Sequence, residues 1–290
     1  MDHTTLDAID VHVHVEIDRH GHLSLPEDFL EASAQYFGAD HRAPTMAEIA
    51  DYYRQRRIGA VVFTVDIESA TGHPALSNEE IAEAAGQHSD VLIPFASIDP
   101  AKGAAGARRF RELVTGHGMR GLKFHPSVQN FAPNDGSAYP LLEVAQELGV
   151  PALFHTGQTG IGAGMPGGGG IKLGLSNPML LDEVAVEFPD LTIIMAHPSF
   201  PWQDEALAVA THKPNVYIDL SGWSPKYFPP QLVRYANSLL QDKVLFGSDY
   251  PLITPDRWMS DFAKLDIKPH VRQKIIKDNA VRVLGLEENK

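Results

Sequence analysis

Eight short apolar segments alternate with helical patterns along the chain, and this alternation limits the fold more than any other feature. The apolar segments are Ala8–Val15, Ala60–Val65, Leu92–Ile98, Gly121–His125, Pro151–His155, Thr192–His197, Val216–Leu220 and Val244–Asp249. The helical patterns between and after them are Thr45–Arg57, Ser77–His88, Ala101–Gly116, Tyr139–Leu148, Asn177–Phe188, Asp204–Thr211, Gln231–Leu240, Asp256–Leu265 and His270–Leu284. Such alternation is typical of parallel βαβ units, whose strands are buried on both faces and form continuous apolar runs.

The number of units favours a closed barrel. Eight βα units predict a (β/α)8 TIM barrel rather than an open doubly wound sheet, and 290 residues fit such a barrel with insertions. We expect a single α/β domain over residues 1–290, since no linker or internal repeat divides the chain. Two segments are additions: an irregular stretch, Glu16–Pro44, with a short helix near Pro26–Tyr36, and a glycine-rich stretch, Gly157–Gly174, expected as a flexible lid or substrate loop.

Charge and composition exclude several classes of function. The formal net charge of -13 argues against binding to nucleic acid or to an anionic membrane. The chain has no cysteine, so disulfides, thiolate metal sites and cysteine nucleophiles are excluded. The N-terminus lacks a signal-peptide pattern, and no apolar run approaches transmembrane length. We therefore expect a cytoplasmic protein with a small-molecule substrate, and a homodimer is compatible with the helical surface of a barrel.

The first apolar segment carries two histidines in an alternating pattern. Apolar Ile9, Val11, Val13 and Val15 alternate with polar Asp10, His12 and His14. This period predicts a strand with both histidines on one face. Imidazole is too polar to lie unpartnered on a buried strand, and its neutral form is a good ligand for zinc and related ions. The pair is therefore half of a candidate metal site.

The other half is expected where the later strands end. In a barrel the C-terminal ends of all strands meet at one mouth, where function is found. The polar residues at these ends are Asp66, Asp99, Lys123, His125, His155, His197, Asp219 and Asp249. Among them, His155 and Asp249 could join His12 and His14 in a nitrogen and oxygen site for one divalent ion, with a position left for water.

Each of these residues also has a simpler interpretation. A lone histidine at a strand end is usually a hydrogen-bonded structural residue, and Asp249 alone could cap the next helix. Turn or capping roles suit Asp66 and Asp99 better, and Asp219 could line the mouth or bond a neighbouring loop. The glycine-rich stretch lacks the position of a dinucleotide fingerprint, because it follows the fifth strand rather than the first. The metal site is predicted by the combination of His12, His14, His155 and Asp249 and not by any one of them.

The same residues belong to motifs that resemble the amidohydrolase superfamily. The motifs are Asp10-Val-His12-Val-His14, Leu122-Lys123-Phe124-His125-Pro126, His155-Thr-Gly, Met195-Ala-His197-Pro and Phe246-Gly-Ser-Asp249-Tyr-Pro251. Within the superfamily, the chain is most similar to the amidohydrolase-related branch that includes aminocarboxymuconate-semialdehyde decarboxylase. The resemblance covers nearly the whole chain.

The resemblance implies a metal-dependent barrel enzyme with named site residues. His12, His14, His155 and Asp249 would bind one divalent metal, Zn²⁺ first and Mn²⁺ as an alternative, and His197 would lie beside the metal-bound water. Some members carry a carbamylated lysine on the fourth strand between two metals, so the state of Lys123 stays open. We favour substrate-binding or supporting roles for Lys123 and His125, and Trp223 is a candidate for an aromatic cavity wall.

Three functions follow, in order of expectation. The first is metal-assisted hydrolysis of a small amide, lactone or ester, with His197 and Asp249 as catalytic residues. The alternative is non-oxidative decarboxylation of an aromatic or unsaturated carboxylic acid on the same metal. Decarboxylases of this branch tend to have the pattern His-x-His-x-x-Pro, whereas Ile17 stands at the proline position here, which lowers that alternative. The third is a ligand-binding barrel without catalysis.

Overall fold

The strands form a closed ring. The computed structural model describes residues 1–39 and 43–287. Its parallel strands are β1 (Ala8–His14), β2 (Ile58–Phe63), β3 (Leu92–Pro94), β4 (Leu122–Phe124), β5 (Ala152–His155), β6 (Ile193–Ala196), β7 (Val216–Asp219) and β8 (Val244–Leu245). They pair in chain order as β1–β2–β3 and β4–β8. Parallel bridges from Ala96 to Leu122 and from Val13 to Tyr250 join the two sheets, so the predicted (β/α)8 barrel is confirmed.

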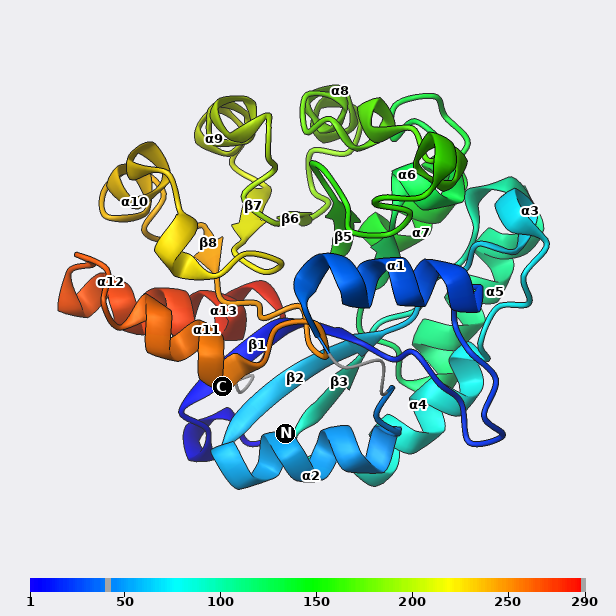
Figure 1. Ribbon diagram of the computed structural model, residues 1–290, viewed down its shortest axis with the longest axis horizontal. Helices are drawn as coiled ribbons and strands as arrows, with labels where there is room; N and C mark the ends of the chain where they lie inside the picture. Colours follow the sequence, from blue (N-terminus) through cyan, green and yellow to red (C-terminus); the bar gives the residue numbers. More distant parts are fainter. Residues whose placement is uncertain (40–42, 288–290) are drawn as a thin grey trace.

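Helices surround this ring (Figure 1). They are α2 (Met46–Arg56), α3 (Glu68–Thr71), α4 (Asn78–Gln87), α5 (Gly103–His117), α6 (Pro126–Gln129), α7 (Tyr139–Glu147), α8 (Leu180–Glu187), α9 (Gln203–His212), α10 (Pro230–Ala236), α11 (Pro255–Phe262), α12 (Pro269–Gln273) and α13 (Asn279–Val283). The predicted capping box of α2 is present, because Thr45 accepts from the backbone of Glu48 and the Glu48 side chain accepts from Thr45. A π-helical turn, Lys274–Asp278, connects α12 and α13 in the last predicted helix.

Strand β1 departs from simple alternation at one point. Its register with β2 shifts between Asp10 and Val13, which marks a β-bulge. Below the bulge Ile9 and Val11 pack in the apolar interior with β2, β3, β5, β6 and β8, whereas Val13 packs with the outer layer of helices. His12 and His14 lie together on the inner side, as predicted. Asp10 does not share their face, and its carboxylate accepts instead from the Tyr53 hydroxyl of α2.

The interior of the barrel is divided into an apolar lower part and a polar mouth. The lower part contains Ile9, Val11, Val61, Phe63, Ile93, Phe95, Leu153, Ile194 and Leu245, and Ala280 and Val281 of α13 pack against it together with Leu284, the residue after the helix. Burial of this apolar surface provides the main driving force for closing the ring. The strand-end histidines and aspartates lie above this layer, where the sheet positions them against one another.

The two additions to the barrel cover the mouth together. Helix α1 (Glu27–Phe37) lies within the irregular segment 16–44, of which residues 40–42 fall outside the described residues, and it crosses the middle of the view in Figure 1. The glycine-rich segment folds into two short 3₁₀ helices, Pro166–Gly170 and Leu173–Ser176, and packs against α1. The Tyr36 hydroxyl donates to Oε1 of Gln158 over 3.1 Å. Gly169 lies so close to Phe29 that a Cβ there would be 2.8 Å from the ring.

No helix among the described residues is both long and apolar enough to cross a membrane.

Candidate metal centre

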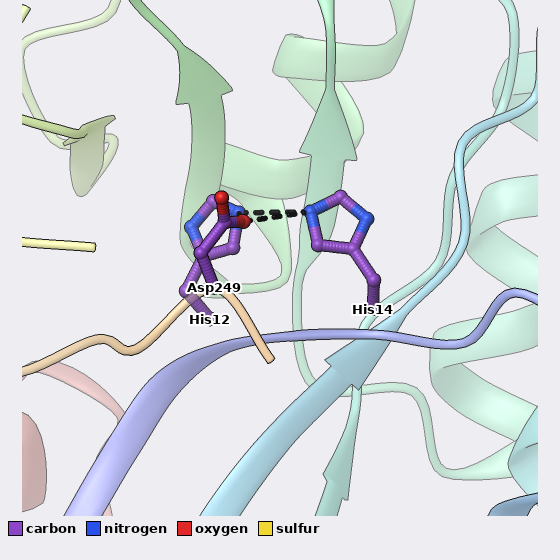
Figure 2. Close-up of side chains that lie close together, drawn as sticks. All are labelled: His12, His14 and Asp249. Atoms are coloured by element: carbon purple, nitrogen blue, oxygen red, sulfur yellow. Dashed lines mark hydrogen bonds and ion pairs between the residues drawn. The ribbon is translucent and has the colours of Figure 1, made fainter. Parts of the chain in front are cut away.

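Three of the predicted ligands form a tight cluster at the mouth. Nε2 of His12 lies 3.1 Å from Nε2 of His14 and 3.3 Å from Oδ1 of Asp249, and Nε2 of His14 lies 3.2 Å from the same oxygen. Figure 2 shows the three side chains converging from β1 and from the segment after β8. The three donor atoms therefore form a nearly equilateral triangle.

The backbone fixes this triangle across the junction of β1 and β8. The amide of Asp249 donates to the carbonyl of His12 over 3.0 Å, and the amide of His14 donates to the carbonyl of Tyr250 over 2.8 Å. Asp249 and His197 have φ values of 74° and 75°, a left-handed conformation that is uncommon for residues other than glycine. Strain of this kind persists where the surrounding structure requires one side-chain direction, and it occurs here at two of the predicted catalytic residues.

A buried carboxylate orients His12. Nδ1 of His12 lies 2.7 Å from Oδ2 of Asp219, and both side chains are fully buried. In the neutral imidazole, the proton on Nδ1 is donated to this carboxylate, so Nε2 carries the lone pair that faces the cluster. A carboxylate behind a histidine in this way is the usual outer partner of a metal-ligating imidazole.

His155 and His197 lie beside the triangle. Nδ1 of His155 is 2.9 Å from Nε2 of His197, and the other nitrogen of His155 is 3.3 Å from the carbonyl of Gly157. The ring of His197 lies 4.9 Å from that of His12, and its Nδ1 contacts the carbonyl and the hydroxyl of Ser221 at 3.0 Å. His155 is thus adjacent to the triangle but not part of it, and a ligand role would require it to exchange one of its two hydrogen bonds for the metal.

Lys123 and His125 differ in their access to the mouth. Lys123 is fully buried, and its Nζ lies 3.2 Å from Nε2 of His12 and 4.5 Å from the centre of the Phe63 ring. The structure therefore places Lys123 against a predicted ligand, as a supporting role requires, and Lys123 is not among the described residues that line the cavity. His125 does line the cavity, and its ring stacks on that of His155 at 3.8 Å.

The electrostatics of the site favour neutral imidazoles. Burial, reinforced by the positive charge of Lys123, lowers the pKa of His12 and His125 well below the ordinary value. Burial and the neighbouring His125 lower the pKa of His155 well below its ordinary value, and burial lowers that of His197 to about 4. Neutral imidazoles keep the lone pairs that a metal needs.

The charged groups of the site respond to burial in opposite ways. Burial lowers the pKa of Lys123 to about 7 and raises that of Asp219 to about 7. Burial would raise the pKa of Asp249, but the hydrogen bond with His14 and the electrostatic interactions with His197, His14 and Lys123 outweigh this effect and hold the pKa below its ordinary value. Asp249 is therefore the carboxylate of the site whose ionised form is favoured.

The donor set fits a divalent metal ion. Ligand atoms about 2.0–2.2 Å from one ion lie about 2.8–3.6 Å from one another in octahedral or tetrahedral geometry. The separations of 3.1, 3.2 and 3.3 Å in the triangle fall in that range. With a metal bound, both imidazoles would turn a lone pair toward the ion, and its charge would offset their repulsion with the ionised carboxylate.

A cavity of about 560 Å³ opens directly on this cluster. His14, His125, His155, His197 and Asp249 form its floor, and helix α1, the start of the glycine-rich segment and the segments after β7 and β8 form its walls. The predicted aromatic wall residue Trp223 lines the cavity, and the centre of its ring lies 5.6 Å from that of Phe200. Its volume is that of a pocket for a small organic molecule.

A model of the amidohydrolase family matches residues 9–286, nearly the whole chain. The chain belongs to the amidohydrolase family. The resemblance that the motifs predict, including that to the decarboxylase-containing branch, is confirmed, and the chain is a metal-dependent type of barrel enzyme. No curated protein sequence matches the chain.

Several solved structures have a fold similar to that of this amidohydrolase. An uncharacterized TIM-barrel protein, Bb4693 from Bordetella bronchiseptica, has a TM-score of 0.77 and 24% identity, covering 97% of this chain and 99% of that one. Dihydroxybenzoic acid decarboxylase from Polaromonas, with bound manganese and 2-nitroresorcinol, has a TM-score of 0.69 and 17% identity, covering 98% of each chain. A probable 2-pyrone-4,6-dicarboxylic acid hydrolase from Acinetobacter baumannii, with citric acid bound, has a TM-score of 0.62 and 16% identity, covering 97% of this chain and 100% of that one.

Two supporting interactions of this amidohydrolase site were not predicted from the sequence. Asp219 was recognised at a strand end, but its contact with His12 was not, because the two residues are 207 positions apart. The carboxylate of Asp10 accepts from Tyr53, from the amide and hydroxyl of Ser248 and from the amide of His12. The only sequence signal for these contacts is that Asp10 and Asp219 each lie in or at the end of a predicted apolar strand, where a polar side chain is expected to be buried.

Proposed function

We propose that this amidohydrolase is a metal-dependent, non-oxidative decarboxylase of a small aromatic or unsaturated carboxylic acid. The observation that carries the proposal is the cavity, which ends on His14 and Asp249 and is otherwise walled largely by apolar and aromatic side chains such as Leu30, Phe37 and Trp223. A flat acid fits such a cavity with its reacting group at the metal cluster. Decarboxylases of aromatic acids recur among the structures of similar fold, which supports this function over the hydrolysis first expected from the sequence.

The proposed metal is a single divalent ion. His12, His14 and Asp249 would hold it, with His155 as the proposed fourth ligand after it gives up one of its hydrogen bonds. When bound, the ion supplies a positive charge that polarises substrate oxygens. Nitrogen and carboxylate donors suit both Zn²⁺ and Mn²⁺, and manganese in the dihydroxybenzoic acid decarboxylase makes Mn²⁺ the first ion to test.

The chain's own residues would handle the proton. In decarboxylation the bond between the ring carbon and the carboxyl carbon breaks, carbon dioxide leaves, and the electron pair on the ring carbon takes up a proton. Asp249 is ionised and lines the cavity, so it can accept a proton from a substrate hydroxyl and return it to that carbon. His197 is neutral and held by Ser221, so it can orient the reacting group. His125 and Trp223 would bind the substrate, and Lys123 would support His12.

Hydrolysis of a lactone, ester or amide is the second candidate. Ile17 stands where decarboxylases of the branch tend to have proline, and a probable pyrone dicarboxylic acid hydrolase shares the fold. In this reaction Asp249 would take the proton of an attacking water and His197 would stabilise the oxyanion, so the same residues serve both reactions.

A substrate panel separates the two candidates. Protein loaded with Mn²⁺ or Zn²⁺ is assayed for carbon dioxide release from hydroxybenzoates and for ring opening of lactones. We expect carbon dioxide release that disappears in His14→Ala and persists in the control His22→Ala, whose imidazole is exposed and bonded to Asp18. Ring opening without any carbon dioxide would overturn the decarboxylase proposal, and retention of full activity after complete metal removal would overturn both candidates.

A further inference from the structure

Arg257 is the only arginine or lysine among the described residues that line the cavity. It lies on α11, eight residues after the proposed ligand Asp249, and its side chain is exposed. In a chain with 37 acidic and 24 basic residues, an arginine commonly finds an acidic partner on the surface. Within the described part of the chain, however, the Arg257 side chain forms no ion pair and no hydrogen bond.

The neighbouring acids are already engaged. Asp256, the preceding residue, binds Arg56 and the hydroxyl of Tyr52. Asp261 lies one helical turn further on, where it could pair with Arg257, but it accepts from Ser224 and Lys264 instead. Glu27 and Glu31 of α1 also line the cavity, and neither lies within the 4.0 Å of an ion pair with Arg257. The guanidinium therefore has its donors available to a ligand.

The backbone around Arg257 is fixed. Thr254 caps α11 by accepting from the amide of Arg257 over 3.2 Å. The next residue, Trp258, is fully buried, and its indole Nε1 donates to the carbonyl of Leu220 over 3.1 Å. A side chain that starts from such a fixed base loses less freedom when it binds a ligand, which favours a specific contact.

Two buried polar atoms belong to residues in the wall of the cavity. Nδ1 of His125 and the hydroxyl of Ser33 are buried, both residues line the cavity, and neither atom has a hydrogen-bond partner among the described residues. Leaving such a group unpaired costs about 1–3 kcal/mol, so a ligand or water is expected to satisfy it. The apolar and aromatic side chains of the cavity wall, such as Leu30, Phe37 and Trp223, suit a ring.

We propose that Arg257 binds a carboxylate of the substrate, separate from the group that reacts at the metal cluster, and thereby makes the enzyme specific for an aromatic or unsaturated acid with two anionic groups. The proposal rests on the proposed function for the location of the reacting group. A planar guanidinium matches a carboxylate through two parallel hydrogen bonds, whereas a lysine would offer only a point charge. Arg257 is thus a specificity-determining residue and not a proton carrier.

Binding of simple probes to the metal-loaded protein tests this assignment without any turnover. We expect isophthalate, with two carboxylates, to bind at least tenfold more tightly than benzoate by calorimetry. In Arg257→Gln this preference should fall to less than threefold while benzoate affinity changes less than twofold, and Arg257→Lys should restore part of it. Arg234→Gln is the matched control, because Arg234 is an exposed helical arginine outside the cavity wall.

Three outcomes would overturn the assignment: an unchanged preference in Arg257→Gln, no preference in the wild type, or tighter binding of benzylamine than of isophthalate, which would show that Glu27 and Glu31 dominate. The result is separate from the decarboxylase test. A protein that releases carbon dioxide but ignores the second carboxylate contradicts only the role of Arg257. A protein that prefers isophthalate through Arg257 but never releases carbon dioxide contradicts only the proposed reaction.

Discussion

At the scale of single residues, the site depends on side chains that act through others. Asp219 does not line the cavity, yet it fixes which nitrogen of His12 faces the cluster. His197 is not a member of the donor triangle, yet its ring lies against that of His12. Asp249 is also close enough to His197 to influence the pKa of its imidazole. The effects of replacing Asp219 or His197 can therefore be distinguished from the effects of replacing a ligand.

Replacing Asp219 should weaken metal binding without removing a ligand. Asp219→Asn removes the charge that supports His12, and loss of such an outer partner typically weakens metal affinity about 10–100-fold. Competition with a chromogenic chelator measures the affinity. Asp99→Asn is the control, because Asp99 is also buried but caps the short helix Pro100–Lys102 and is not a member of the cluster. An equal loss in both variants would mean that the effect is general destabilisation.

Replacing His197 should separate catalysis from metal binding. His197→Asn removes the neutral imidazole beside the cluster, and loss of a positioned acid–base group typically lowers turnover about 10²–10⁴-fold. Metal content measured by elemental analysis should stay near that of the wild type. If metal and activity are lost together, His197 is a ligand and its predicted role is wrong.

At the scale of elements, the covering layer depends on a glycine turn that no other residue can form easily. Gly167 and Gly169 belong to the same 3₁₀ turn, with φ values of 61° and 64°. A Cβ on Gly167 would meet open space, whereas a Cβ on Gly169 would lie 2.8 Å from the ring of Phe29 on α1. The two positions thus share the backbone requirement and differ only in the contact with the helix.

This difference gives a matched pair of variants. Both Gly167→Ala and Gly169→Ala should lose about 1–2 kcal/mol from the left-handed backbone. Gly169→Ala should lose a further 1–3 kcal/mol or so, because the methyl group must displace Phe29. Urea unfolding measures both, and an equal loss would show that α1 does not pack tightly on the glycine turn.

A second pair of variants tests how β1, β8 and α2 are joined. The hydroxyl of Tyr53 donates to the buried carboxylate of Asp10 over 2.8 Å, whereas the hydroxyl of Tyr52 bonds to Asp256 near the surface. Tyr53→Phe leaves a buried carboxylate short of one donor, so we expect a loss of about 1–3 kcal/mol in the free energy of unfolding. Tyr52→Phe should lose less than about 0.5 kcal/mol. Equal effects would contradict a structural role for the Asp10 network.

At the scale of the whole molecule, the candidate metal centre lies where the barrel closes. β1 begins the first sheet and β8 ends the second, and the donor triangle takes two members from β1 and one from the segment after β8. A bound ion would therefore link the two ends of the strand order, at the junction already made by the bridge from Val13 to Tyr250.

Metal binding should consequently stabilise the entire fold. An ion at about 100 times its Kd that binds only the folded state contributes about 2.7 kcal/mol, which corresponds to a rise of several degrees in Tm. Thermal unfolding of chelator-treated protein, with and without added Mn²⁺ or Zn²⁺, measures the shift. His14→Ala should show little or no shift, and an undiminished shift in that variant would place the ion elsewhere.

Much of this organisation follows from local pattern. The eight apolar segments predict the eight strands, and the barrel then implies that His12, His14, His155, His197 and Asp249 meet at one mouth. The position of α1 within segment 16–44 and the capping box at Thr45 were also predictable, since helix signals are carried by neighbouring residues. Strand ends were less accurate, because β8 is only Val244–Leu245 and the polar residues after it lie in an irregular segment.

The sequence by itself determined the fold class, the polar mouth and the amidohydrolase family, because strand and helix periods, the order of strand ends and the short motifs at those ends are local properties of the chain. Only the tertiary structure decided that a bulge turns Asp10 away from His12, that Asp219 supports His12, that His155 stands beside the triangle and that Lys123 lies outside the cavity wall. Those outcomes depend on distances between residues far apart in the chain. Such distances are set by strand register and by closure of the ring, which no local pattern specifies.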